Sequence, residues 1–268
     1  MTIKTSDKEP EVPRRTRTAA GTRIREVPAV RRATDILWHL GKHGNGQTLS
    51  MIARDLEIIP STCLHILREL MRARLVSFEE TSKLYTLGLG VLELPRSMNR
   101  HNIFIHAAQP YLNQLVRELN VSATALQLDS TDMVVVAEST PTGGIAGLVG
   151  SRVVCLSSSV GRLVAAHSGW NTTTLREQFN LVRWQAAPDF QDWLIEVRAA
   201  DRRGYAVDNG EFRRGITSIA APIIARSGRM TRAISINIVS AQLDRKRIPK
   251  YAKTVKETAQ AIVAHLHD

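Results

Sequence analysis

The sequence predicts an α+β protein, with an N-terminal winged helix-turn-helix and a larger C-terminal domain built on a largely antiparallel sheet. Residues 28–88 fit three short amphipathic helices followed by a hairpin. Beyond residue 102, helical segments alternate with strands joined by short turns, which favours antiparallel pairing. The longest apolar runs, such as "MVVVA" and "IAAPIIA", have strand length and fall below the roughly 20 residues of a membrane helix.

The charge of the chain predicts a polyanionic partner. Its 268 residues carry a net charge of +11, and the pI is near 10.2. The segment "PRRTRTAAGTRIRE" (13–26) holds five arginines and one acid and lacks apolar periodicity. We therefore expect residues 1–27 to form a disordered basic arm. Nucleic acid is the expected partner rather than a membrane, because no amphipathic helix accompanies the arm.

The N-terminus and the cysteines favour a cytoplasmic protein. The polar start "MTIKTSDKEP" lacks the apolar stretch of a secretory signal. Cys63 and Cys155 are far apart on apolar-periodic segments, so two buried thiols are expected rather than a disulfide. His39 and His43 have a spacing that can bind zinc on a helix, but no third ligand lies nearby. His43 is better explained as a C-terminal helix cap, and neither a metal nor a cofactor is expected.

The first two helices of the winged unit follow from apolar spacing and end signals. A helix from Pro28 should end at Gly41 or Gly44, and Thr48 should cap the second helix. The first helix is expected to bury one face, made of Val30, Ala33, Leu37 and Leu40. The second is expected to bury Leu49, Ile52, Ala53 and Leu56.

The third helix has the polar edge of a recognition helix. Ser61 is expected to cap this helix over residues 61–73, which buries Leu64, Leu67, Leu70 and Met71. The outward edge then holds Ser61, His65, Arg68 and Arg72. Ser61 and Thr62, at the N-terminal end, would contact phosphate or bases, and Arg68 can reach guanine or a phosphate.

A hairpin completes the unit predicted over residues 28–90. The segment "LVSFEETSKLYTLG" (75–88) predicts two strands joined around Thr81–Lys83. A solvated amphipathic helix is the ordinary explanation of the polar edge. Together with the hairpin, the basic arm and the net charge, however, the edge favours DNA binding.

The second domain is expected over residues 106–268, after a linker at 91–105 that Pro95 interrupts. Its helices are predicted at 106–120, 159–167, 189–203 and about 250–265. Two strands, "ATALQLD" and "MVVVAES", meet at a turn at Ser130–Asp132, and a glycine-rich loop (141–150) precedes a strand at "RVVCL". Two further strands join at Ser227-Gly228.

From Pro28 onward the chain resembles the IclR family of bacterial transcriptional regulators. The resemblance is carried by "PAVRRATDIL", "PSTCLHILRELMRARLV", "YTLG" and "RRGYAVDNGEFRRGITSIAAPI" followed by "AISI". Its most specific part is the spacing of Gly204-Tyr205, Asp208, Gly215 and Ile219-Ala220-Ala221-Pro222. The resemblance implies a GAF-like effector-binding domain, a homodimer or dimer of dimers, and a small organic acid as the signal.

The resemblance also implies an effector pocket in the second domain. The family's ligand-binding helix start falls at Ser159 and Val160, where unpaired backbone N–H groups favour an anion. Other pocket positions fall at Asp208, Ser218, Ser235 and Asn237, with Ile216 as an apolar wall. Ser235 and Asn237, two apart on one strand, should share a face. An Asp after a strand and polar residues within strands otherwise serve as turns and backbone partners.

The sequence departs from the family pattern at several positions. His65 replaces a common arginine, and Arg74 replaces a common glycine after the third helix. Ser218 replaces a cysteine, and Asn237 replaces a serine, so the pocket should be more hydrophilic. Glu79 and Glu80 disfavour a close approach of the hairpin to phosphate.

We therefore expect a DNA-binding repressor of a catabolic operon. It would respond to a small organic acid, with an aromatic acid as one candidate, and bind double-stranded DNA as a homodimer or dimer of dimers. The alternatives are an activator of the same type and an architectural DNA binder with a degenerate effector domain. An enzyme using Cys155 or a serine of "LSSSVG" is a third reading. It is weakened by the lack of a Gly-x-Ser-x-Gly elbow and of a clear His/Asp partner, His167 being the nearest histidine.

Overall fold

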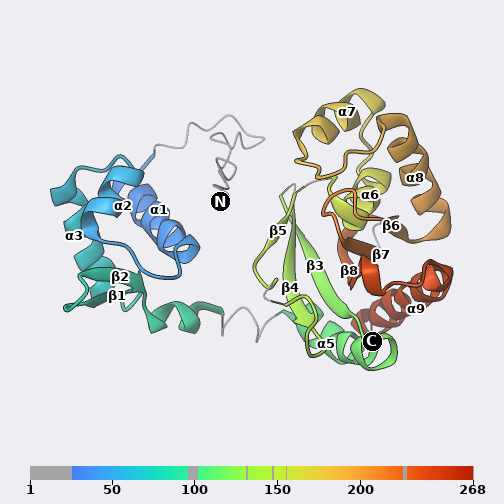
Figure 1. Cartoon of the computed structure of the whole chain (residues 1–268), viewed down its shortest axis with the longest axis horizontal. Helices are drawn as coiled ribbons and strands as arrows, with labels where there is room; N and C mark the ends of the chain where they lie inside the picture. The colour runs from blue at the N-terminus through green and yellow to red at the C-terminus, as the bar shows by residue number, and fades with distance from the viewer. Residues whose placement is uncertain are drawn as a thin grey trace, which may run out of the picture. The chain divides into compact units, whose positions relative to one another are not determined.

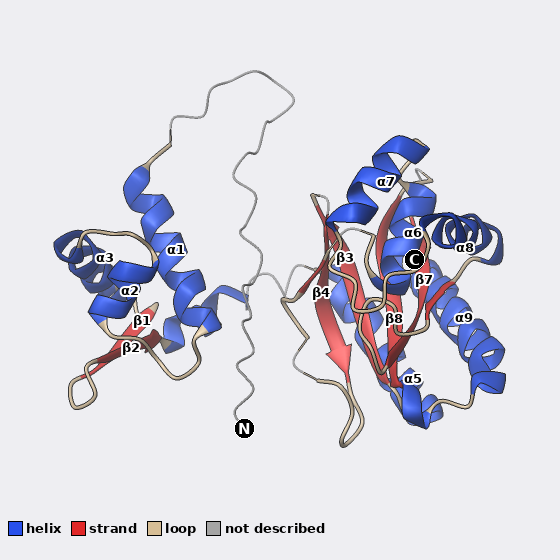
Figure 2. Cartoon of the chain, turned by 45° about the horizontal axis from the view of Figure 1, so that its top comes forward, coloured by secondary structure: helices blue, strands red, loops and turns tan. Residues whose placement is uncertain are grey.

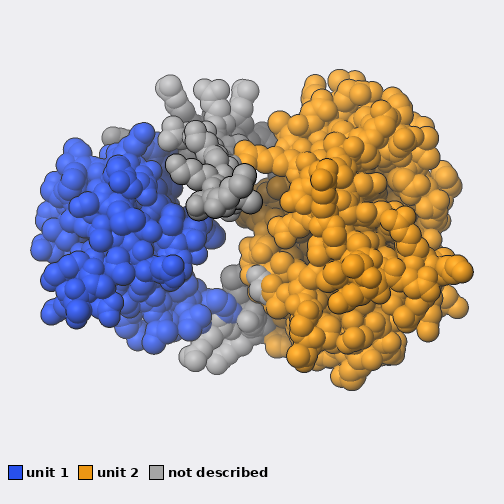
Figure 3. All heavy atoms as spheres, in the orientation of Figure 1, with its two compact units in different colours: residues 1–96 blue, residues 97–268 orange. Residues whose placement is uncertain are grey.

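The computed structural model describes residues 26–95, 102–130, 132–146, 148–154, 156–225 and 228–267. The chain divides into two compact units, residues 1–96 and 97–268, which Figure 3 distinguishes by colour. The predicted arm, apart from its last two residues, lies outside the described residues, and so do part of the predicted linker, Cys155 and Ser227.

Unit 1 is a winged helix-turn-helix, as predicted (Figure 1). Its helices are α1 (Pro28–Lys42), α2 (Leu49–Asp55) and α3 (Pro60–Arg72). Strands β1 (Val76–Glu79) and β2 (Leu84–Leu87) form the antiparallel wing, and a 3-10 turn, η1 (Leu89–Glu93), follows. In this fold α2 and α3 form the helix-turn-helix pair.

The core of unit 1 corrects two predicted helix faces. It contains Ile36, Leu40, Ile52, Ala53, Ile58, Cys63, Leu67, Leu70, Val76 and Tyr85. Val30, expected to be buried, is 61% exposed, and Cys63 rather than Leu64 enters the core. Val30 and Leu64 each lie roughly a quarter turn around the helix axis from the centre of the buried face. The buried faces predicted from apolar spacing alone were therefore rotated slightly about the helix axis from the observed ones.

The helix ends are partly as predicted. The Thr48 hydroxyl caps α2 by accepting a hydrogen bond from the Met51 amide at 3.4 Å. The prediction for Ser61 was wrong, because α3 begins at Pro60 and its N-cap residue is Ile59. Proline suits a first helical position, since its missing N–H has no partner to lose there. The first helix continues through Gly41, and its C-cap is His43.

Arg74 adopts the left-handed conformation that the family's glycine would favour, with φ 61°. The Arg74 amide donates to the Met71 carbonyl and the Leu75 amide to the Leu70 carbonyl, both at 2.9 Å. This pair of bonds is a Schellman motif. The cap itself is conventional, and a side chain other than glycine in this left-handed conformation carries a steric cost.

Unit 2 is built on a six-stranded sheet in the order β5-β4-β3-β8-β7-β6, in which every described pairing is antiparallel. Helices α5 and α9 cover one face, and α6 and α8 lie toward the other (Figure 2). The strands are β3 (Ser122–Asp129), β4 (Asp132–Ser139), β5 (Arg152–Val153), β6 (Ala206–Asp208), β7 (Ile216–Ile224) and β8 (Met230–Val239). The helices are α5 (Ile103–Leu119), α6 (Ser158–His167), α7 (Thr172–Leu181), α8 (Phe190–Arg203) and α9 (Ile248–His267), with 3-10 turns η2 (Ser240–Gln242) and η3 (Arg245–Arg247).

Four elements of unit 2 differ from expectation. Helix α7 was not predicted, although its cap was visible in the sequence: Asn171 accepts a hydrogen bond from the Thr174 amide at 2.9 Å. Strand β6 was also missed, because three residues are too few to show an alternation. The strand predicted at "RVVCL" is limited to β5, and α5 begins inside the predicted linker.

The two faces of the sheet have separate cores. The face toward α5 and α9 is packed with every second residue of β7 and β8, mostly isoleucines, including Ile219, Ile234 and Ile236. The opposite face packs Ala206, Ala220 and Ala233 against Val160 and Leu163 of α6. Small alanines on this second face let α6 approach the sheet closely, and this approach positions the candidate effector site.

Candidate DNA-binding surface and effector site

The outer edge of α3 carries the side chains predicted to contact DNA. Ser61, His65, Arg68 and Arg72 are exposed, whereas Thr62 is half-buried. The Arg72 guanidinium donates to Glu69 at 2.7 Å, so it is partly neutralised. Burial raises the pKa of the Tyr85 hydroxyl, and the Arg68 guanidinium opposes this rise. Arg68 therefore lies within electrostatic range of Tyr85 in the wing strand β2.

The wing is held to the end of α3 by two glycines. A Cβ on Gly88 would lie 2.4 Å from the Arg74 carbonyl oxygen, and one on Gly90 would lie 2.6 Å from the same atom. The Gly90 amide donates to this carbonyl at 2.9 Å. Glu79 and Glu80 are exposed near the tip of the hairpin. The contact fixes the hairpin relative to the recognition helix.

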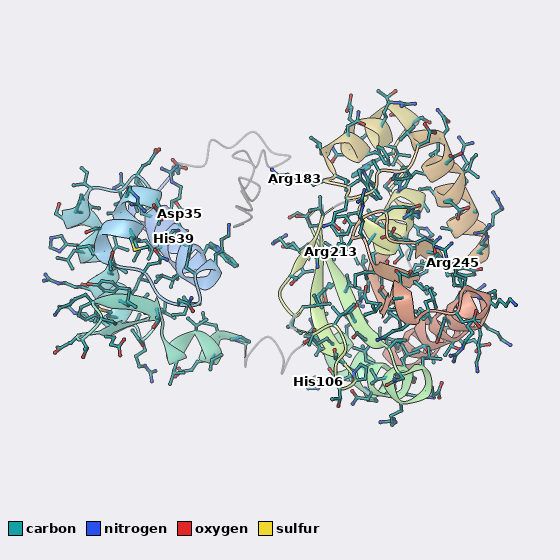
Figure 4. The ribbon with its side chains drawn as sticks, in the orientation of Figure 1. Asp35, His39, His106, Arg183, Arg213 and Arg245 are labelled. Atoms are coloured by element: carbon teal, nitrogen blue, oxygen red, sulfur yellow. The ribbon has the colours of Figure 1, made fainter. Side chains whose placement is uncertain are left out.

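His39 of α1 and His43, the C-cap residue of α1, have structural roles. His39 Nε2 lies 3.8 Å from Asp55 Oδ2, which connects α1 to α2. Burial, together with His43, lowers the pKa of His39, and Asp55 opposes that shift. The His43 ring nitrogen Nδ1 is 2.8 Å from the His39 carbonyl oxygen. Figure 4 labels Asp35 and His39 on this helix. Within the described residues, no group of three or more His, Cys, Asp and Glu side chains is arranged to bind a metal.

In unit 2, a row of polar residues crosses the sheet beneath α6. Asp208 of β6 pairs with Ser218 of β7, which pairs with Asn237 of β8, which pairs with Ser122 of β3. Residues paired directly across antiparallel strands point to the same face. The structure therefore brings three of the predicted effector residues into one row and adds Ser122, which the sequence analysis missed.

The start of α6 lies directly over this row. The Ser159 amide donates to the Ser218 hydroxyl at 3.3 Å, and the two hydroxyl oxygens share a hydrogen bond of 2.8 Å. A Cβ on Gly161 would lie 2.1 Å from the Leu156 carbonyl carbon. Only a glycine therefore allows the helix to pass this close to the segment that precedes it.

The remaining predicted positions surround this contact. Val160 is 2% exposed and packs in the core between α6 and the sheet. Ile216, half-buried, begins β7 on the face of Ser218. Ser235 is 3% exposed, and its carbonyl accepts a hydrogen bond from the Thr124 hydroxyl at 3.3 Å. By strand parity it shares the face of Asn237, as expected.

Described residues of the glycine-rich segment contact the β3 end of the row. The Ser122 hydroxyl accepts a hydrogen bond from the Ile145 amide at 2.8 Å. A Cβ on Gly144 would lie 2.8 Å from the same hydroxyl oxygen. The Leu148 amide donates to a Glu138 carboxylate oxygen at 2.8 Å. The first two contacts place Gly144 and Ile145 beside Ser122, the β3 end of the row.

The sequence analysis missed a buried ion pair at the other end of the row. Arg162 of α6 is 2% exposed and pairs with Glu211, which follows β6. The Glu211 amide donates to Asp208 Oδ1 at 2.9 Å. Burial, strengthened by a side-chain hydrogen bond with Glu211, raises the pKa of Asp208 to about 6, although Arg162 opposes the shift. The signal in the sequence was a single arginine in the otherwise apolar segment "GRLVAA".

These two units define a helix-turn-helix regulator with a second, separately folded domain. The IclR helix-turn-helix domain matches residues 29–80, and the domain described as bacterial transcriptional regulator IclR C-terminal matches residues 96–264. The chain belongs to the IclR family of bacterial transcriptional regulators. The predicted resemblance is thereby confirmed, and the family is one of regulators rather than enzymes.

Individual relatives agree with this assignment. The repressor AllR of Escherichia coli is 24% identical over 248 residues, which cover 87% of this chain and 88% of AllR. The IclR regulator from Alicyclobacillus acidocaldarius superposes with a TM-score of 0.77 at 24% identity, covering 90% of this chain and 99% of the regulator. An IclR homologue from Microbacterium hydrocarbonoxydans, solved with 4-hydroxybenzoate, has a TM-score of 0.75 at 20% identity, covering 89% and 99%.

No described helix has the length and apolar composition needed to span a lipid bilayer.

Proposed function

We propose that this regulator is a repressor that binds operator DNA through α3 and that a small organic acid controls its affinity for DNA. The exposed row on α3 is the observation that carries the proposal. Ser61, His65 and Arg68 follow one edge of a helix whose opposite face is fixed in the core by Cys63 and Leu67. A helix held in this way can enter the major groove with its N-terminal end at the bases.

A homodimer fits this reading, because two recognition helices can then bind two half-sites about 34 Å apart or a multiple of it. Unit 1 exposes large apolar side chains that a second copy would cover. Trp38 of α1 is 74% exposed, and Leu89 and Leu92 of η1 are 81% and 66% exposed. A Cβ on Gly41 would lie 3.6 Å from a methyl of Leu87, so α1 and the end of β2 are neighbours. Apolar surface at this density is typical of an interface.

We assign the effector to the polar row of unit 2, beneath the start of α6. Ser159 and Ser218 supply hydroxyls there, and Asp208 and Asn237 flank them. The 4-hydroxybenzoate complex of the Microbacterium homologue supports an aromatic acid as one candidate. The repressor AllR supports repression as the direction of control.

The proposal is tested with DNA that the protein selects itself. The full-length chain is used to enrich binding sequences from a random library, and affinity is then measured by fluorescence anisotropy. Specific sites should bind at least about a thousandfold more tightly than scrambled DNA. Equal affinity for both would support an architectural binder instead.

A reporter decides the direction of control. With the selected site placed over a promoter, expression of the chain should lower transcription, and an effector acid should restore it. A rise in transcription on expression of the chain would assign it as an activator.

A further inference from the structure

A buried arginine lies beside the candidate effector site. The Arg162 side chain is 2% exposed, and its guanidinium pairs with Glu211. One of its terminal nitrogens donates to the Ser158 carbonyl over a long 3.4 Å. Within the described part of the chain, its Nε is buried without a hydrogen-bond partner. Taking this charge out of water is costly, and the cost is recovered only when every donor is satisfied.

Arg162 faces the polar row rather than solvent. Ser159 and Arg162 are three residues apart on α6, so they lie on the same face of the helix. Ser159 contacts Ser218, and the strand partner of Ser218 is Asp208. The Arg162 charge acts on Asp208, since it opposes the rise in the pKa of that carboxyl. Cation, hydroxyls and carboxyl therefore converge on one corner of the sheet.

Glu211 reaches the buried cation from a loop, residues 209–215, that connects β6 to β7. Its amide donates to Asp208, and its carbonyl accepts a hydrogen bond from the Ala186 amide at 2.9 Å. Arg213, labelled in Figure 4, belongs to the same loop. The Glu211 side chain is 29% exposed, whereas its partner is buried. The pair thus has one edge open to solvent, from which an anion can approach.

We propose that Arg162 is the cation that pairs with the carboxylate of the effector and that Glu211 occupies this place when no effector is bound. The inference rests on the proposed effector site and adds its charge selectivity. Effector binding then exchanges one carboxylate for another on the guanidinium, and the loop that carries Glu211 is released. If the ion pair only fastened the loop, added acids would not compete with Glu211 for the guanidinium.

The surroundings of Arg162 restrict the chemical class of the ligand. One buried cation balances one negative charge, and the Asp208 and Glu211 carboxyls disfavour a second. The hydroxyls of Ser159 and Ser218 can bind a neutral oxygen of the ligand. The predicted effector is therefore a small monocarboxylic acid with a hydroxyl or carbonyl group, and not a dicarboxylate or an amide.

Thermal unfolding of the full-length chain tests this selectivity. The probes are two matched series: 4-hydroxybenzoate, 4-hydroxybenzamide and terephthalate, and lactate, lactamide and malonate. At least one monocarboxylate should raise the melting temperature, and its amide and dicarboxylate counterparts should not. A ligand at a hundred times its Kd stabilises a protein enough to be measured in this way.

Substitutions of Arg162 and Glu211 then test whether the ion pair causes this selectivity. Arg162→Gln should weaken binding of that acid at least tenfold and abolish the preference for acid over amide. Glu211→Gln should strengthen binding severalfold, because the competing carboxylate is gone. Arg203→Gln is the matched control, since it breaks the half-exposed pair of Arg203 with Glu196 elsewhere in unit 2. It should bind like the wild type.

The outcomes separate the inference from the proposed function. If the wild type responds to an acid and Arg162→Gln responds equally, with the same preference over the amide, Arg162 is only structural and the effector site stands. If no acid changes the melting temperature or the DNA affinity of the wild type, both proposals fail. Should Arg162→Gln not fold, Arg162→Gln/Glu211→Gln removes both charges together and must show the same loss of acid preference.

Discussion

At the scale of single residues, the position of Asp208 in the fold determines the pKa of its carboxyl. The side chain is 2% exposed, lies beside a second carboxyl and faces a buried guanidinium. Burial favours the protonated form, and the guanidinium only partly opposes it. If the same local sequence lay on the surface, this Asp would be an ordinary turn residue. Its burial makes folding of the regulator sensitive to pH.

We predict that stability falls as pH rises from about 4 to 6. The folded pKa is about 6 and the ordinary value is 3.8, so the folded state binds more protons than the unfolded state within this window. The contribution is present below the unfolded pKa and is lost as pH rises through the folded pKa. Asp208→Asn should flatten the change, by on the order of 2 kcal/mol. Urea unfolding at pH 4 and pH 7 measures this difference in the free energy of unfolding. An equal difference for the wild type and for Asp208→Asn would contradict the prediction.

At the scale of elements, close packing decides what each helix tolerates. Gly161 of α6 passes against the carbonyl group of Leu156, whereas Gly41 of α1 only approaches a methyl group of Leu87. Both glycines lie inside helices and neither has a positive φ. By helix propensity alone, alanine would stabilise both positions by up to about 1 kcal/mol.

The two substitutions should therefore have opposite signs. Gly41→Ala is expected to raise the free energy of unfolding by roughly 0.5 kcal/mol. Gly161→Ala is expected to lower it by more than about 2 kcal/mol, because its Cβ would lie 2.1 Å from backbone that cannot move away easily. Chemical denaturation of the two variants compares them directly. A stable Gly161→Ala protein would mean that α6 can shift away from the sheet.

The recognition helix is tested by its exposed arginine. Arg68→Ala should weaken binding to the selected operator by about 1 to 3 kcal/mol if the side chain contacts a base, and should reduce discrimination at one position of the site. Arg203→Ala, on unit 2, serves as the control for loss of one surface charge. If Arg68→Ala weakens specific and scrambled DNA equally, the side chain contacts phosphate only.

At the scale of the whole molecule, the distribution of charge along the chain influences its affinity for DNA. The net charge of +11 is spread over both units, so DNA affinity should depend strongly on salt. Residues 13–25 contain five arginines, the highest density of basic residues at the N-terminal end of the chain. They lie outside the described residues, and their role in binding is a prediction from sequence.

Deleting residues 1–27 should lower DNA affinity and flatten its dependence on salt. Each phosphate contact that is lost reduces the slope of log affinity against log salt concentration by about 0.9. Anisotropy titrations at several salt concentrations give this slope for both chains. An unchanged slope would show that the basic segment does not contact DNA.

The sequence alone was sufficient for the architecture of unit 1 and for the family. Amphipathic periodicity is local, so the exposed row from Ser61 to Arg72 could be predicted from spacing within a single helix. The antiparallel sheet followed similarly from strands joined by short turns. The matching spacing around Asp208 and Pro222 carried the resemblance to the IclR family.

Only the tertiary structure decided the chemistry of the candidate site. Arg162 and Glu211 are 49 residues apart, and nothing in either local sequence pairs them. The raised pKa of Asp208 depends on burial, which a single strand of three residues does not reveal. The entry of Cys63 rather than Leu64 into the core depends on how α3 is rotated against α1 and α2. Local periodicity is a property of neighbours in sequence, whereas burial and charge pairing arise from residues that meet only when the chain folds.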